Sequence, residues 1–470
     1  MKIYNTLTRA KEEFKPLEDG KVKMYACGIT VSGEAHIGHG YQALIYDIMR
    51  KFLEKQGYAV TYARNYTDVD DKIIAKSRET GIPADKYAAD MIENIDRIMA
   101  RFDVDEPTVW LKATENIGNI IDFIEKLIAS GHAYPADNGD VYFDLTSFRR
   151  YGCLSNRSVE DMLDGVRVEN GEQKRNPADF ALWKAAKEGE ISWKSPWGEG
   201  RPGWHIECSA MNRAAFGEQI DIHGGGRDLI FPHHENEIAQ TESLTGKQFA
   251  RFWTHNGLIK VNGQKMSKSL NNSLLLNDLL DKYSNEAVKF ALLQTNYRND
   301  INITDGIFDE AEKHMTGFYT VIKKVEGEFG KAACSADSGS GGNPEIDSRF
   351  NAVMSDDFNT ALALSDLFGI FKNISRKTAA GDKTAADDVR QVRATYSLLG
   401  LFKKDAAEYL AETAARRGGE IPERVKELAA ARWNAKAARN WAEADALRAE
   451  IDALGYAVKD SKDGYTITEK

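Results

Sequence analysis

Four residues of the types that bind zinc stand out in this chain. An apolar, strand-like segment runs into Gly224-Gly225-Gly226, and the proline that follows is expected to start a helix carrying His233 and Glu237 one turn apart on a single face. Cys208 precedes this stretch, and Cys27 lies in a separate segment near the N-terminus. Two thiolates, an imidazole and a carboxylate suit zinc in ligand type and number. Spacing alone also allows two buried cysteines and a surface His–Glu ion pair, so both interpretations stay open here.

A second set of candidate residues lies where a predicted strand meets a predicted helix. Residues 21–27 alternate in the manner of a strand, residues 27–30 leave it as a loop, and residues 41–53 place apolar side chains on one helical face. His36-Ile37-Gly38-His39 stands at this junction, where a glycine lets a ligand approach and a helix N-terminus attracts phosphate. Much later, Lys265-Met266-Ser267-Lys268-Ser269 follows a predicted strand and an Asn-Gly turn. Taken alone, this lysine pair would be a solvated turn.

The elements that must position these motifs alternate between strands and helices. A second predicted strand at 58–63 leads into another helix, and this order predicts a parallel sheet with its ligand site at the carboxyl ends of the strands. Helical periodicity dominates from about 85 to 130. Residues 134–204 are irregular and rich in turn residues, so we interpret them as an insertion between two halves of one nucleotide-binding domain.

The second half of the chain is mainly helical by its periodicity. Amphipathic helices are predicted from about 275 to 329 and from 346 to 403. Between them, residues 331–344 are rich in Ser, Gly and Ala and are expected to form a mobile linker. A helical tail then ends in short predicted strands at 456–458 and 465–467.

The composition is that of an ordinary soluble protein, and a cytoplasmic location is expected from its cysteines. A chain of 470 residues exceeds what one hydrophobic core supports, so two to four domains are expected. The sequence has no run of about 18 apolar residues, so membrane spanning is not expected. The 4 cysteines lie far apart, which fits a reducing compartment. A net charge of -10 argues mildly against nucleic acid, but binding depends on a local basic face and not on the total.

His36-Ile37-Gly38-His39 (HIGH) early and the 265–269 motif (KMSKS) late are far more specific together than either is alone. In this order, across a split parallel-sheet domain, the pair resembles the class I aminoacyl-tRNA synthetases. Cys27-Gly28 and the segments 203–211 and 224–237 are similar to the cysteinyl-tRNA synthetases in particular, and the match covers nearly the full length. The sequence departs from that family's common pattern at Ile29, at Ser32-Gly33, and in a C-terminus without its usual tryptophan.

The resemblance implies an α/β fold: a split Rossmann-like parallel-sheet catalytic domain with an inserted connective domain, then an α-helical bundle and a small C-terminal anticodon-binding domain. The expected segments are 1–125 and 204–250 for the catalytic halves, 126–203 for the insertion, 251–310 for a stem-contact region with the KMSKS loop, 311–410 for the bundle, and 411–470 for the anticodon-binding domain. A monomer is expected, since no long heptad seam suggests assembly.

The activity implied by the resemblance is ATP-dependent activation of L-cysteine to cysteinyl adenylate, followed by transfer of cysteine to the 3′ end of tRNA(Cys). One zinc ion per chain, held by Cys27, Cys208, His233 and Glu237, would bind the substrate through its sulfur, and Mg²⁺ is expected with ATP. A zinc site with soft ligands prefers a thiolate to a serine hydroxyl. Pocket shape alone separates near-isosteres by only about 1–3 kcal/mol, so a metal–sulfur bond adds selectivity that packing cannot.

The resemblance also implies roles for further residues. Those expected to act on the ATP phosphates are His36, His39, Lys265 and Lys268, the lysines as a lid. Those expected to bind ATP are Gly38, Gly224, Gly225, Asp228 and Lys268. Those expected to bind cysteine are Thr30, Trp204 and His223, for which a turn-capping threonine, a core tryptophan and a strand-end histidine are the alternatives. Those expected to bind the anticodon are Trp441, Asp445 and Asp460, with Arg432 and Lys436 among the phosphate contacts.

Two other functions compete with this one. The first is a ligase that transfers activated cysteine to a small amine, as the mycothiol-pathway relatives of the family do; those relatives lack the anticodon domain expected here at 411–470. The second is a zinc protein that binds nucleic acid or nucleotide and has lost catalysis. The intact HIGH motif and both KMSKS lysines argue against the second function.

Overall fold

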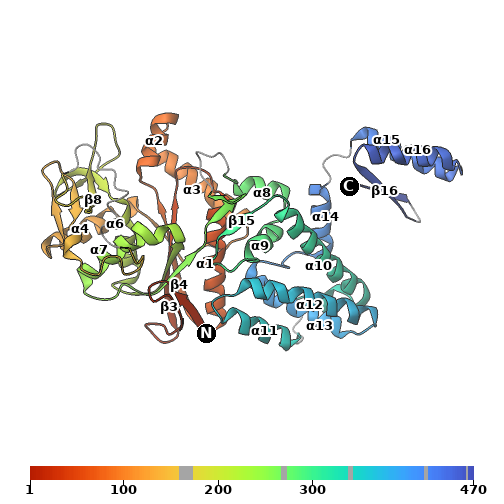
Figure 1. Cartoon of the computed structure of the whole chain (residues 1–470), viewed down its shortest axis with the longest axis horizontal. Coiled ribbons are helices and arrows are strands. Elements are labelled where there is room, and N and C mark those ends of the chain that lie inside the picture. Colours follow the sequence, from red (N-terminus) through yellow and green to blue (C-terminus); the bar gives the residue numbers. More distant parts are fainter. Residues whose placement is uncertain (158–172, 266–272, 337–341, 418–421, 462–463, 470) are drawn as a thin grey trace.

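The computed structural model describes residues 1–157, 173–265, 273–336, 342–417, 422–461 and 464–469. The molecule is elongated, with an inserted unit at one end, a central sheet, a helical bundle and a small C-terminal unit at the other end (Figure 1). Among the described residues, no helix is both long and apolar enough to cross a membrane.

The centre of the fold is a parallel sheet with the strand order β12-β11-β3-β4-β5. Its strands are β3 (Lys21–Thr30), β4 (Ala59–Thr67), β5 (Val109–Lys112), β11 (Ile220–Gly226) and β12 (Ala250–Asn256). The chain adds β4 and β5 on one side of β3, and later adds β11 and β12 on the other side. The order therefore reverses between β3 and β11, and the carboxyl ends of these two strands border the crevice where such sheets bind ligands.

Helices cover both faces of this sheet, which confirms the predicted α/β fold. Val22, Met24 and Ala26 of β3 share a core with α1 (Ile37–Lys55), whereas Tyr25 and Cys27 pack with α6 (Trp204–Phe216) and α7 (Glu235–Thr245). Alternate residues of a strand point to opposite faces, so a strand covered on both sides is apolar almost throughout. β3 follows this pattern from Met24 to Cys27, whereas the exposed Lys21 and half-buried Lys23 give its first residues the alternation seen in the sequence.

The described residues between 133 and 202, which are 133–157 and 173–202, contain a separate antiparallel sheet with the order β6-β7-β8-β10-β9. Its strands are β6 (Ala133–Pro135), β7 (Val141–Phe143), β8 (Phe180–Ala185), β9 (Trp193–Ser195) and β10 (Gly198–Pro202). This sheet lies between the two halves of the parallel sheet in the sequence and shares a hydrophobic core with α4 (Ile117–Ala129). An insertion between two catalytic halves was the predicted arrangement.

Several element boundaries differ from the sequence-based expectations. The stretch expected to be helical from 85 to 130 is interrupted by β5, which separates α3 (Ala84–Arg101) from α4. A four-residue strand is too short to leave a period of its own. β3 and β4 continue to Thr30 and Thr67, beyond their predicted ends, because both remain paired there. α7 starts at Glu235, after an irregular turn that contains the expected start at Pro232.

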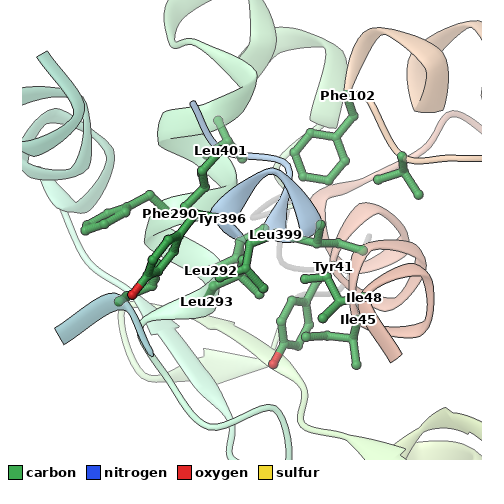
Figure 2. Packing of buried hydrophobic residues seen from close by; sticks show 14 of the residues in the cluster. Tyr41, Ile45, Ile48, Phe102, Phe290, Leu292, Leu293, Tyr396, Leu399 and Leu401 are labelled. Carbon is green, nitrogen blue, oxygen red and sulfur yellow. The ribbon is translucent and has the colours of Figure 1, made fainter. Parts of the chain in front are cut away.

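The helical bundle packs directly against the catalytic domain. Its helices are α8 (Leu276–Lys282), α9 (Asn285–Leu293), α10 (Ile307–Phe329), α11 (Pro344–Met354), α12 (Thr360–Ala379), α13 (Thr384–Tyr396) and α14 (Ala406–Arg417). Tyr41 and Ile48 of α1 lie near Leu292 of α9 and Leu399, all in one buried cluster (Figure 2). The predicted linker at 331–344 contains a 3₁₀ turn at Lys331–Cys334 and the first residue of α11, and its residues 337–341 lie outside the described residues.

The C-terminal unit has a small core of its own. It consists of α15 (Glu423–Ala437), α16 (Trp441–Ala453), β16 (Tyr456–Ser461) and β17 (Gly464–Glu469), and it lies at the far end of the molecule from the insertion (Figure 1). Val425, Leu428, Ile451 and Val458 form the centre of its core. The short strands predicted for the tail are thus present as an antiparallel pair.

Candidate functional site

The four predicted zinc ligands meet beneath the carboxyl end of β3. Cys27 lies on β3, Cys208 on α6, His233 just before α7 and Glu237 on its first turn. Cys27 Sγ is 3.7 Å from Cys208 Sγ and 3.5 Å from Glu237 Oε1, and His233 Nε2 is 3.1 Å from the same Glu237 oxygen. Tetrahedral zinc with bonds of about 2.0–2.3 Å would separate its ligands by about 3.3–3.8 Å. These donor atoms therefore fit zinc, and the two sulfurs are too far apart for a disulfide.

A second set of donors shares two members with the first. Cys27 and Glu237 also meet His223 and His234, with His234 Nε2 3.3 Å from Cys27 Sγ and His223 Nε2 2.9 Å from Glu237 Oε2. His234 is engaged on its other nitrogen by His255 at 2.8 Å. This set offers a single thiolate, whereas the first offers two. In the first arrangement His223 and His234 become the partners that orient the ligands, as second-layer groups do in metal sites.

The pKa shifts of the four groups in the first set favour two negative charges and one positive charge. Burial raises the pKa of the Cys27 thiol, and the hydrogen bond that this thiol donates lowers the pKa of Cys208 to about 6. Burial also opposes charge on the other two groups, but Cys208 and Glu237 raise the pKa of His233 to about 10, and His223 and His233 lower the pKa of Glu237 to about 2. The cluster thus balances a buried thiolate and carboxylate against an imidazolium.

A cavity of about 950 Å³ opens at the switch point of the sheet. It is large enough for a nucleotide together with a small second substrate. Its walls contain six residues of the sequence-based prediction: Thr30, His36, Gly38, His39, Trp204 and Asp228. Trp204 is 39% exposed toward this space, and its ring centroid lies 4.4 Å from that of His233. The metal-type cluster therefore lies directly behind one wall of the cavity.

The two histidines of HIGH lie together at the N-terminus of α1. His36 is the N-cap, and its Nδ1 accepts a hydrogen bond from the N–H of Gly38 at 3.1 Å. His39 Nδ1 accepts from the N–H of His36 at 3.3 Å, and the two rings stack with centroids 3.6 Å apart. α1 therefore starts four residues earlier than predicted, because these side chains cap it. Its positive dipole end and both rings face the same cavity.

Main-chain bonds bring the region after KMSKS next to HIGH. The N–H of Ile37 donates to Leu274 O at 2.9 Å, and that of Leu276 donates to Ala35 O at 3.0 Å. Ser273 and Leu275 line the cavity. The predicted strand and Asn-Gly turn are present as β13 (Ile259–Val261) and the turn after it, and the expected loop begins instead with a short second strand, β14 (Gln264–Lys265), which pairs with β13. The backbone of Lys265 belongs to β14, whereas Lys268 lies outside the described residues.

Among the described residues predicted to bind ATP or cysteine, three do not line the cavity: His223, Gly224 and Gly225. His223 is buried against Trp253, with ring centroids 4.5 Å apart, and contacts Glu237. A Cβ on Gly224 would lie 2.3 Å from the hydroxyl oxygen of Tyr46, so the glycine there makes room for that ring. Gly225 is likewise crowded by Leu229 and His234. In the described structure Gly226 is the member of this glycine run that faces the cavity.

The predicted anticodon residues divide into two groups. Trp441 is 58% exposed at the start of α16, and Asp445 is exposed one turn later, so Trp441 does not pack inward. Asp460 instead forms a bidentate ion pair with Arg432, whose two terminal nitrogens lie 2.8 and 2.9 Å from the carboxylate oxygens. A second ion pair joins it to Lys436 Nζ at 2.5 Å. These two basic residues, expected to contact phosphate, are thus paired within the domain.

Sequence reasoning missed residues that support the ligands. Asn65, at the end of β4, accepts a hydrogen bond from the N–H of Gly28 at 2.9 Å, and a Cβ on Gly28 would lie 1.6 Å from the carbonyl oxygen of Asn65. Gln42 donates to the carbonyl of Cys27 at 2.6 Å. His205 Nδ1 lies 2.9 Å from His233 Nδ1 and so leaves Nε2 of His233 for the cluster. A polar residue at the end of a buried strand was the signal available for Asn65.

Comparisons with known proteins agree along the whole chain. Residues 13–313 match the family model for the tRNA synthetases class I (C) catalytic domain, residues 349–403 the DALR domain, and residues 418–467 the cysteinyl-tRNA ligase anticodon binding domain. The cysteine–tRNA ligase of Syntrophotalea carbinolica is 44% identical, covering 99% of this chain and 98% of that one. That of Geobacter sulfurreducens is 42% identical, covering 99% of each.

A solved structure shares the fold. Mycobacterium tuberculosis methionyl-tRNA synthetase in complex with methionyl-adenylate superimposes with a TM-score of 0.61 over 86% of this chain and 94% of that one. The sequence identity is 13%, so this likeness concerns the fold alone.

The cluster predicts one tightly held zinc ion that depends on Cys208. Replacing Cys208 by Ala removes one of the two sulfur donors, so the purified variant should hold far less than one zinc per chain, as measured by a colorimetric chelator after denaturation. Cys334→Ala is the matched control, because Cys334 lies buried in the helical bundle. Equal zinc content in both variants would show that the metal is held elsewhere.

Zinc binding should also release protons in a number set by these pKa values. At pH 7 the apoprotein carries protons on Cys27 and His233 but not on Glu237, and mostly not on Cys208. All four ligands must be deprotonated to bind metal, so about two protons should leave per zinc, rising toward three below pH 6 as Cys208 becomes protonated. Calorimetric titrations in two buffers of different ionisation enthalpy count them. A release of less than one proton at pH 7 would contradict this ligand set.

Proposed function

The chain belongs to the cysteine–tRNA ligase family of the class I aminoacyl-tRNA synthetases, and we propose that it selects L-cysteine at zinc held by Cys27, Cys208, His233 and Glu237. It is a ligase enzyme with a class I catalytic domain and a cysteinyl-type anticodon domain. The observation that carries the proposal is the position of this cluster directly behind a wall of the cavity that HIGH also lines. The cavity can then hold the thiol end of cysteine near the cluster and the ATP phosphates at α1.

Zinc in this cluster would supply a soft Lewis acid that takes up the substrate thiol as thiolate in preference to the hydroxyl of serine. The chain's own residues must then orient the rest of the amino acid. Trp204 lies between His233 and the cavity, and Thr30 ends β3 at the cavity wall. We assign both to the binding of cysteine. His223 supports Glu237 from behind, so its part in substrate binding would be exerted through that carboxylate.

Activation places the cysteine carboxylate next to the α-phosphate of ATP. The carboxylate oxygen forms a bond to phosphorus, and the bond to the β-phosphate oxygen breaks, which yields cysteinyl adenylate and pyrophosphate. Charge that builds on the phosphates is stabilised by the N-terminus of α1 and by His36 and His39, together with Mg²⁺ carried by ATP. Gly38 and Asp228 line the same space and are assigned to ATP; Gly224 and Gly225 would act by shaping the strand behind it.

Lys265 and Lys268 are proposed to close over the departing pyrophosphate. The hairpin that carries Lys265 is fixed at its base by Asp300, which accepts a hydrogen bond from the N–H of Leu258 at 3.0 Å and pairs with Lys260 at 3.0 Å. Asn302 accepts from the N–H of Gly263 at 2.7 Å. A fixed base limits the positions that the lysines beyond it can reach.

The second step transfers the cysteinyl group to the 3′ end of tRNA(Cys). Attack of the terminal ribose hydroxyl on the adenylate's carbonyl carbon forms the ester and expels AMP. We assign recognition of the anticodon to the C-terminal unit, where Trp441 is exposed for stacking on a base and Asp445 can accept hydrogen bonds. Asp460 would act by holding Arg432 and Lys436 in place.

We further propose that the protein acts as a cytoplasmic monomer with parts at 1–125, 126–203, 204–250, 251–310, 311–410 and 411–470, except that the second catalytic half extends to Asn256, where β12 of the central sheet ends. The match of residues 418–467 to an anticodon-binding domain favours tRNA over a small amine as the acceptor.

Charging with labelled amino acids tests the proposed function. The zinc-loaded protein with ATP and Mg²⁺ should attach cysteine to tRNA and leave serine unattached. His39→Ala should slow ATP–pyrophosphate exchange by about 100-fold, because one group that stabilises phosphate charge is lost. His314→Ala on α10 is the control and should react normally.

Two outcomes would contradict the proposal. Exchange of pyrophosphate without charging of tRNA would favour a ligase that transfers cysteine to a small amine. Equal charging with serine would contradict selection at the metal.

A further inference from the structure

A loop of the inserted unit is wrapped around a carboxylate next to the zinc-type cluster. Glu235, the first residue of α7, is 0% exposed. Its Oε1 accepts hydrogen bonds from the N–H of Gly152 at 2.9 Å and of Leu154 at 3.4 Å, and its Oε2 accepts from the N–H of Ser155 at 2.7 Å. Both oxygens of this carboxyl group thus accept hydrogen bonds from the backbone of another part of the chain, in an arrangement like an anion-binding nest.

The backbone conformation of the loop at 150–157 directs its N–H groups toward Glu235. Gly152 adopts a φ of +89°, and a Cβ there would lie 2.0 Å from the carbonyl oxygen of Arg157. Asn156 has a φ of 57°, and its N–H donates to Gly152 O at 2.7 Å. A left-handed conformation at two positions curls the chain so that its N–H groups converge on one point. Glu235 occupies that point.

Further contacts tie the same loop to the segment that carries the ligands. The hydroxyl of Tyr151 donates to Asn236 Oδ1 at 2.5 Å, and Arg150 pairs with Glu242 at 2.9 Å. The guanidinium of Arg157 lies over the ring of Phe231, 4.8 Å from its centroid. The loop at 150–157 therefore touches the metal-type segment before, between and after His233 and Glu237.

His233 needs such external support because its own backbone is irregular. The turn at Ile230–His234 contains Phe231 with φ −139° and ψ 130°, so the ladder of an α-helix does not extend back through it. The position of a side chain at the start of a helix depends on the backbone that precedes it. Glu235 is the first α-helical residue after His233 and lies two residues before Glu237.

We propose that Glu235 is a positioning residue that locks the loop at 150–157 onto α7 and thereby holds His233 and Glu237 in place to bind zinc. The proposal rests on the zinc assignment made under Proposed function. Both oxygens must act as acceptors, so an amide is a poor substitute. In Glu235→Gln the NH₂ group would face a backbone N–H, and at least one buried N–H would lose its partner.

The test compares Glu235→Gln with the wild-type protein. Zinc release to an excess of chelator should be about tenfold faster in the variant, a loss typical of residues that orient metal ligands. The KM for cysteine should rise while the KM for ATP stays unchanged. Hydrogen exchange of the apoprotein should show faster exchange at Gly152, Leu154 and Ser155. Glu218→Gln, at a surface pair with Lys247, is the matched control and should behave as wild type.

A folded Glu235→Gln protein that releases zinc at the wild-type rate would overturn the proposal. If that variant does not fold, Tyr151→Phe decides, because it removes one hydroxyl from the same contact: faster zinc release supports the proposal, and an unchanged rate overturns it. Failure of the zinc assignment itself would appear separately, as wild-type protein without zinc. In that case the amide exchange of the apoprotein still shows whether Glu235 holds the loop.

Discussion

The structure depends on burying four ionisable side chains next to one another. Cys27, Cys208, His233 and Glu237 are at most 3% exposed, and burying thiolate and carboxylate together is costly unless a cation compensates them. Their donor atoms come from one strand, one helix and the start of another. The sheet order brings these elements together, because β3 and β11 are neighbours although nearly two hundred residues separate them.

The metal-type cluster and the cavity draw on both halves of the divided catalytic domain. The first half supplies Cys27 and HIGH, and the second supplies Cys208, His233 and Glu237. The inserted unit is more than a spacer, since its loop at 150–157 contacts the segment that bears two of the ligands. α1 carries HIGH at its N-terminus, and its residues Tyr41, Ile45 and Ile48 lie in the same buried cluster as residues of the helical bundle (Figure 2). The described residues that line the cavity come from the catalytic halves and from the segments on either side of KMSKS.

Local patterns in the sequence were enough for much of this account. The strand-to-helix junction at HIGH and the glycine run that ends β11 could be found from residue type and spacing. The four metal-type residues were candidates on that basis, and the family resemblance singled them out as zinc ligands. The βαβα order predicted a parallel sheet with its ligand site at the carboxyl ends of the strands, and the structure supplies the strand order that places β3 beside β11. Gly224 shows what local patterns do not predict. It lacks a side chain because the ring of Tyr46 from α1 occupies that space, and no local pattern indicates this partner.

Side-chain partners distant in the sequence account for the other differences. Asp460 is drawn into ion pairs with Arg432 and Lys436, because α15 and β16 pack together in the C-terminal unit. Glu235 reads as one more polar residue of α7, and its role depends on backbone N–H groups some eighty residues earlier. The early start of α1 required knowing that His36 caps it. Such contacts are fixed by tertiary packing, which periodicity does not reveal.

The most direct test of the account is the number of sulfur atoms around zinc, measured by X-ray absorption of the zinc-loaded protein with and without substrate. Cys27 and Cys208 supply two sulfurs, so saturating cysteine should raise the number from two to three, while serine should leave it at two. A count that stays at two with bound cysteine would mean that the metal is structural and that the thiol is selected by another part of the cavity.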